Sequence, residues 1–231
     1  MSKIAAGVGW YLIFLFSLVA HEAAHALTAW RLGDPTARKR GQVTLNPLPH
    51  IRREPVGTVL VPIVSYIIGG WMIGWASTPY DPEWAARNPR KAALMSFAGP
   101  AANLLLVLIA AVVIRIGVSA GFFDSPRTLY FGHIVESLRP GALDAVAFLV
   151  SVAFSLNLLL FFFNLMPIPP LDGAGVYMLF SGETGEKINR FLRNPIFSYG
   201  GIIAAWWLLD LLFPRFQDLA IKLLYPGVLY R

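Results

Sequence analysis

Five long stretches of the chain contain no charged residue and consist mostly of apolar side chains. They cover residues 4–20, 56–80, 92–114, 145–171 and 194–209. About 20 apolar residues in a helix cross the hydrocarbon core of a bilayer, and four of the five stretches suit such a helix. In the second stretch, Pro62 and the pair Gly69-Gly70 predict instead a broken, re-entrant hairpin over 56–78. The pattern therefore predicts an α-helical polytopic membrane protein, a bundle of about four to six transmembrane helices.

Composition supports the same class. Of 231 residues, 56% are hydrophobic and 14% are charged, whereas about a quarter of the residues in a soluble domain are charged. No repeat or second soluble domain is visible. We therefore expect residues 1–231 to form one membrane-embedded domain, with a core over about 4–180 and a C-terminal helix with an amphipathic tail over 194–231.

Net charge and cysteine content exclude some functions. The net charge of +6 comes from basic residues in short loops beside apolar runs, so we expect a lipid bilayer as partner and no nucleic acid. The chain contains no cysteine. Disulfides and thiolate ligands are therefore excluded, and a metal ion must be held by imidazole and carboxylate groups.

Basic residues also predict the topology. Between residues 31 and 53 there are six basic side chains and one acidic one, whereas only Lys3 precedes the first apolar run. Because cytoplasmic loops carry the excess of basic residues, the first helix should run from outside into the cytoplasm. If the hairpin re-enters, helix 92–116 runs outward, the connection 117–144 is external, and helix 145–166 runs inward.

The first apolar run ends in the motif His21-Glu22-Ala23-Ala24-His25. A helix places positions i and i+4 on one face, so the two histidines can present ring nitrogens to one metal ion. Glu22 lies close enough to act on a metal-bound water molecule without itself being a metal ligand. Ionisable side chains at membrane depth are costly, and function is the default reason for them.

A catalytic zinc ion takes three protein ligands, so the motif needs a third. The remaining candidates are His50, His133 and Asp172. His50 lies in a proline-flanked loop, and His133 lies in the predicted external connection. Asp172 follows the inward helix after three prolines within 167–170, which must end that helix. Asp172 is therefore expected at the same depth as the histidine pair.

These motifs carry a resemblance to a known family. Residues 21–25, then Phe97-Ala98-Gly99-Pro100-Ala101-Ala102-Asn103, then the stretch from Asn164 through Asp172-Gly173, resemble the site-2 protease family of intramembrane zinc metalloproteases, peptidase family M50. The order and spacing of the motifs match over about residues 10–180.

Two further segments, 45–50 and 74–76, resemble the short bacterial members that lack PDZ and CBS domains. Such members usually continue after the second segment with a lysine and a proline-rich turn. Here Ser77-Thr78-Pro79-Tyr80 follows instead, so that lysine has no counterpart in this chain.

The resemblance implies that His21, His25 and Asp172 hold one zinc ion per chain, that Glu22 is the base, and that Asn164 lies near the active site. There the Asn164 carboxamide is a candidate catalytic group that donates to the oxyanion or fixes the substrate backbone. The alternative is an interhelical hydrogen bond or a helix C-cap. It implies hydrolysis of peptide bonds within or near transmembrane segments of membrane-protein substrates, as in regulated intramembrane proteolysis. It also implies a multi-pass protein of the bacterial inner membrane, with the active site toward the cytoplasm.

A helical substrate must unwind before cleavage, and its freed backbone groups then need partners. The pattern over 41–45 suits a short strand, so Val43 and Thr44 are predicted to bind substrate by β-addition. Asn103 is expected to hold one helix to another. Asn157 is assigned no chemistry.

Two other functions stay open from the sequence. A divalent-metal transporter could use the same ligands, although such proteins usually show inverted repeats and need no glutamate beside the first histidine. A pseudoprotease that binds membrane helices without cutting them is the other alternative. Substrate identity, a requirement for prior cleavage and the oligomeric state are not indicated by the sequence.

Overall fold

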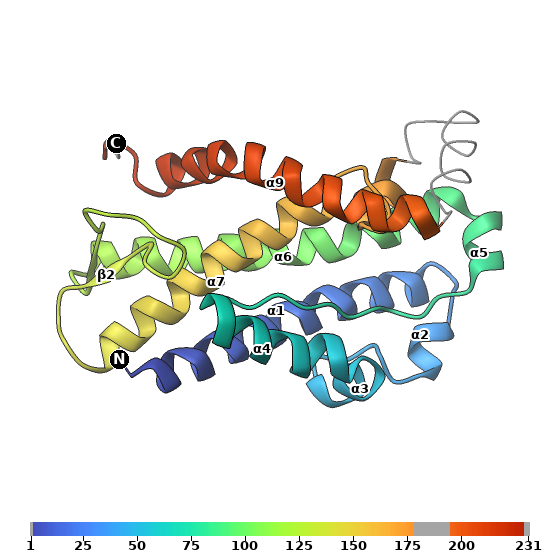
Figure 1. Cartoon of the computed structure of the whole chain (residues 1–231), viewed down its shortest axis with the longest axis horizontal. Coiled ribbons are helices and arrows are strands. Elements are labelled where there is room, and N and C mark those ends of the chain that lie inside the picture. Colours follow the sequence, from blue (N-terminus) through green and yellow to red (C-terminus); the bar gives the residue numbers. More distant parts are fainter. Residues whose placement is uncertain (1, 178–194, 229–231) are drawn as a thin grey trace.

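The computed structural model describes residues 2–177 and 195–228. Within these residues, three helices are long and apolar enough to cross a membrane: α1 (Lys3–Arg31), α6 (Pro89–Ser119) and α7 (Ala142–Asn164). Helix α6 packs against both α1 and α7, and the three lie along one another in the bundle (Figure 1). The prediction of a helical polytopic membrane protein is confirmed.

The second apolar stretch forms a hairpin that is half helix and half extended chain. A π-helical turn (η1, Val56–Leu60) leads into α4 (Val61–Gly69), and Gly70 ends this helix with a φ of 74°, which glycine adopts without strain. Residues 70–81, the return segment, then follow α1 back (Figure 1). Arg53 Nε donates to the Ser77 carbonyl at 2.9 Å and closes the base of the hairpin. The predicted re-entrant hairpin is therefore confirmed.

Because the hairpin returns, α6 starts at the end of the bundle where α1 finishes. Three short helices lie at this end: α2 (Thr36–Lys39), α3 (Pro47–Arg53) and α5 (Pro82–Arg87). We call it the site end, because the C-terminal half of α1 with His21 and His25 leads to it. The connection between α6 and α7 lies at the opposite end and contains a two-stranded antiparallel sheet, β1 (Phe123–Asp124) and β2 (Glu136–Ser137) (Figure 1).

The strand predicted over 41–45 does not form, and that prediction is wrong. Gly41 has a φ of 70°, and the residues after it bend into α3. The Thr44 hydroxyl accepts a bond from the Asn46 N–H, and the Thr44 carbonyl is bonded by the His50 ring. Local hydrogen bonds therefore satisfy this backbone in a turn, in place of a strand edge.

The C-terminal part is one helix, α9 (Pro195–Leu224). We expected a C-terminal helix with an amphipathic tail over 194–231, and the helix continues through Pro214 as far as Leu224. Phe216 packs on Phe162 of α7, with ring centroids 4.9 Å apart. The hydroxyl of Tyr225, just beyond the helix, donates to the Ile134 carbonyl at the end opposite the site. Helix α9 therefore packs on the C-terminal end of α7 and reaches the α6–α7 connection at the opposite end of the bundle.

Candidate metal centre

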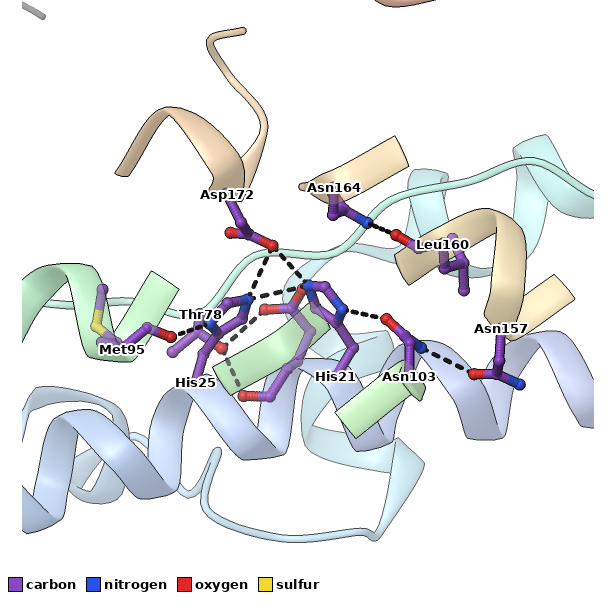
Figure 2. Close-up of polar contacts among 10 residues, drawn as sticks. His21, His25, Thr78, Met95, Asn103, Asn157, Leu160, Asn164 and Asp172 are labelled. Carbon is purple, nitrogen blue, oxygen red and sulfur yellow. Dashed lines mark hydrogen bonds and ion pairs between the residues drawn. The ribbon is translucent and has the colours of Figure 1, made fainter. Parts of the chain in front are cut away.

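His21 and His25 lie one turn apart on α1, and Asp172 meets them just after the end of α7 (Figure 2). The two histidine Nε2 atoms are 2.9 Å apart. Asp172 Oδ2 lies 3.0 Å from His21 Nε2 and 3.3 Å from His25 Nε2. Three donor atoms predicted from distant parts of the sequence thus form one small triangle.

The donor triangle has the size and chemistry of a zinc site. With zinc–nitrogen bonds of about 2.0–2.1 Å, the edges of a tetrahedral ligand set are about 3.3 Å. His25 Nδ1 lies 2.7 Å from the Met95 carbonyl, which only accepts, so the ring proton is on Nδ1 and Nε2 carries a bare lone pair. Two lone pairs and a carboxylate oxygen at such distances fit a bound cation.

Helix α6 has no side chain at Gly99, and the two histidine rings occupy the space beside it. A Cβ added at Gly99 would overlap the Nε2 atoms of both His21 and His25. The closest neighbours of Gly99 are therefore the two imidazole rings of the candidate metal site.

Glu22 is buried beside the triangle and is held by the return segment. The Thr78 hydroxyl lies 2.8 Å from Glu22 Oε2 and 2.8 Å from the Glu22 carbonyl oxygen. Its single proton goes most favourably to the ionised carboxylate, because charge-assisted hydrogen bonds are the stronger ones. Within the described residues, no protein group bonds Glu22 Oε1, so this oxygen is available to a reacting molecule.

A cavity of about 690 Å³ opens onto these groups. Glu22, His25 and Asp172 line it, together with residues of the return segment and of α6. The return segment is fixed beyond the cavity by Asp34, whose carboxylate accepts from the backbone N–H groups of Thr36 and Asp81 at 2.9 and 2.8 Å. Burial would raise the pKa of Asp34, but these hydrogen bonds lower it below its ordinary value.

Behind His21 lies a chain of buried polar side chains whose connection to the site the sequence did not predict. His21 Nδ1 is 2.6 Å from Asn103 Oδ1, and Asn103 Nδ2 donates to Asn157 Oδ1 at 2.8 Å (Figure 2). Asn157 in turn donates to the Ser17 hydroxyl. Asn103 does join helix to helix, as expected, but it also holds a metal ligand. We call Asn103, Asn157 and Ser17 the amide chain.

The other predicted site residues, Asn164, Val43 and Thr44, make no hydrogen bond to the donor triangle within the described residues. Asn164, the last residue of α7, donates its amide to the Leu160 carbonyl at 3.0 Å (Figure 2). Val43 and Thr44 do not line the cavity. The two other histidines lie away from the triangle. His50 bonds within its loop, and His133 stacks on Tyr130 at the opposite end.

Comparison with known proteins agrees with this geometry. The model of peptidase family M50 matches residues 10–208. This chain belongs to peptidase family M50. The match covers α1, the hairpin, α6, α7 and part of α9, and so includes every residue of the donor triangle. No solved structure matches the chain.

Three curated proteins illustrate the relationship. The chain is 37% identical over 160 residues to the Bacillus subtilis protein named "Putative zinc metalloprotease YwhC", which covers 69% of this chain and 63% of that protein. It is 34% identical over 167 residues to "Putative zinc metalloprotease Rip2" of Mycolicibacterium smegmatis, covering 72% and 53%. The Mycobacterium tuberculosis Rip2 is 33% identical over 165 residues, covering 71% and 52%. The matched part thus spans between half and two thirds of these relatives.

Proposed function

We propose that this protein is a zinc endopeptidase that hydrolyses peptide bonds within or near the transmembrane segments of other membrane proteins. One observation carries the proposal. His25 and Asp172 of the donor triangle and Glu22 line one cavity within a bundle of membrane-spanning helices. Regulated intramembrane proteolysis is the process that such a site would serve.

The residues divide the chemistry among them. His21, His25 and Asp172 would hold the zinc ion, which when bound polarises the attacking water and the scissile carbonyl. Glu22 takes a proton from the attacking water at its free Oε1 and returns it to the leaving amine. Thr78 holds the other carboxylate oxygen, so the base keeps one orientation.

The return segment supports a specific mode of substrate binding. A substrate helix must unwind before its carbonyls can react, and its freed backbone groups need hydrogen-bond partners. Ala76, Thr78 and Tyr80 line the cavity. In the described part of the chain no hydrogen bond uses their backbone N–H groups. We therefore place the pairing of extended substrate at residues 76–80, in place of the turn at 41–45.

Charge supports an orientation with the site toward the cytoplasm of a bacterial inner membrane. Within the described residues, eight basic side chains lie outside the long helices: six lie in the loops and short helices of the site end, and two, Arg127 and Arg139, lie in the α6–α7 connection. The chain has no native cysteine, so single cysteines can be labelled cleanly. A cysteine at Lys39 should react only with reagent that enters the cytoplasm, and one at Arg127 from outside. Reaction of both positions from the same side would refute this topology.

The function is tested with Glu22→Gln in purified protein reconstituted with a helical membrane substrate. Loss of the base should lower cleavage about 10²–10⁴-fold while the zinc content stays unchanged. Glu136→Gln, the same replacement at the opposite end of the bundle, is the matched control. Wild-type cleavage by Glu22→Gln would rule out the proposed mechanism. A metal transporter would cleave no peptide substrate, and its transport would not need Glu22 as a base. Membrane proteins that accumulate uncut in cells with Glu22→Ala would identify substrates.

A further inference from the structure

In the amide chain behind His21, each hydrogen bond can have only one donor and one acceptor assignment. The Asn157 amide nitrogen lies 2.8 Å from the Ala153 carbonyl, a group that can only accept, and 2.9 Å from the Ser17 hydroxyl. Oxygen and nitrogen of an amide are told apart by such partners. Asn157 must therefore turn its nitrogen to Ala153 and Ser17, and its oxygen to Asn103.

This direction is passed on to the metal ligand. Because Asn103 faces an oxygen of Asn157, it donates there with Nδ2 and turns Oδ1 toward His21. A carboxamide oxygen only accepts, so the proton of the His21 ring must sit on Nδ1. His21 Nε2 then carries a bare lone pair, as a zinc ligand requires.

The two histidines differ in how this tautomer is secured. His25 Nδ1 bonds the Met95 backbone carbonyl, which cannot become a donor. The partner of His21 is a side-chain amide, which could rotate by 180° if it were unsupported. A rotated Asn103 would offer an N–H to His21 Nδ1 and force the ring proton onto Nε2. That proton would then point at His25 Nε2 and Asp172 Oδ2, into the place of the metal ion.

We propose that Asn157 is a positioning residue for the metal. It fixes Asn103, which fixes the tautomer of His21, and the zinc affinity depends on this chain although Asn157 touches no ligand. All three members of the chain are buried, with exposed fractions of 0% for Asn103 and 1% for both Asn157 and Ser17, so no water can replace a missing partner. The inference rests on the metal site of the proposed function, but not on peptidase activity.

The test is the equilibrium zinc affinity of the whole purified protein, measured by competition with a metal-binding dye. Asn157→Leu keeps a side chain of similar shape and removes every hydrogen bond of the amide. Ser17→Ala removes one acceptor and leaves the Ala153 carbonyl to orient Asn157. We expect Asn157→Leu to bind zinc about 10–100-fold more weakly, and Ser17→Ala to stay within about threefold of wild type. Unfolding temperatures of both variants report damage to the core separately.

Zinc affinity of Asn157→Leu equal to wild type, or equal losses in both variants, would overturn the inference. A wild type that binds no zinc would instead refute the metal site itself. If Asn157→Leu does not fold, nitrogen NMR of the zinc-loaded wild type decides, since the chain has only four histidines and His21 can be assigned by His21→Gln. A proton on His21 Nδ1 supports the inference, and zinc bound at Nδ1 overturns it.

Discussion

Gly99→Ala is the smallest change that should separate the metal site from the fold. The added methyl group would enter the space of His21 Nε2 and His25 Nε2. In an ordinary helix interior the same replacement would stabilise by about 1 kcal/mol. Here the methyl group must displace the rings that bind zinc.

The expected size follows from packing. Forcing an extra methyl group into a well-packed interior costs about 1–3 kcal/mol. Since about 1.4 kcal/mol corresponds to a factor of ten in an equilibrium constant, zinc binding should weaken about 5–150-fold if the rings yield. Cleavage at limiting zinc should fall with it, and excess zinc should restore part of the activity.

Gly200→Ala is the matched control, because it makes the same replacement in α9 where a new Cβ would meet no atom within 4 Å. Zinc affinity and cleavage should be unchanged in this variant. The assay is zinc content after dialysis against a series of buffered zinc concentrations, with thermal unfolding in parallel. Wild-type zinc affinity in Gly99→Ala would refute the close contact between α6 and the two rings.

Three other predictions follow from the return segment. Thr78→Val should lower kcat about tenfold with KM and zinc content kept, whereas Thr78→Ser should retain most activity, because a hydrogen bond to a charged group contributes about 1.5–3 kcal/mol; equal losses in both variants would contradict this. Ala76→Pro should impair cleavage without loss of zinc, and Val43→Pro should lower cleavage only slightly, since proline removes a backbone donor that matters only where substrate pairs. A larger loss of peptide cleavage in Val43→Pro than in Ala76→Pro would instead support substrate binding at 41–45. Asp34→Ala should destabilise by about 1–3 kcal/mol at pH 7. The pKa of Asp34 is lowered in the folded state, so this difference should be complete above about pH 4 and vanish as the pH falls further, and a pH-independent difference in chemical denaturation would refute it.

The metal ligands could be predicted because each depends on a strong and simple signal. Helical periodicity places His21 and His25 on one face, and the prolines before Asp172 end α7 at a definite point. The direction of each helix follows from charge and from the number of crossings. None of these steps requires knowledge of side-chain packing.

The amide chain could not be predicted, although its members were visible as polar residues in apolar runs. A carboxamide in an apolar helix needs a partner, but it can pair with almost any polar group. The choice of His21 as the partner of Asn103 depends on how α1 and α6 are rotated against each other, which hydrophobicity alone leaves open.

Two places where the local structure differs from a simple reading of the sequence have related causes. Over 41–45 the alternating pattern is short, and the backbone forms a turn in which Thr44 bonds Asn46 and His50 instead of pairing as a strand. In the C-terminal part, where we expected a helix with an amphipathic tail, Pro214 removes one helical bond, but α9 continues through it. Aromatic packing of Phe213 and Phe216 on Phe162 of α7 holds both sides of the proline in one helix.

The hairpin and the metal centre are two consequences of one constraint. If residues 56–78 crossed the membrane fully, α6 and α7 would both reverse, and Asp172 would leave α7 about 30 Å away from His21, on the other side of the bilayer. Instead, Gly70 turns the chain, and the return segment brings Thr78 to Glu22 on its way back. The turn that sets the direction of α7 therefore also delivers the residue that orients the base. Metal ligands and base are assembled at the same end because the chain crosses the bilayer twice between them, through α6 and α7, and this even number of crossings requires that residues 56–78 do not cross.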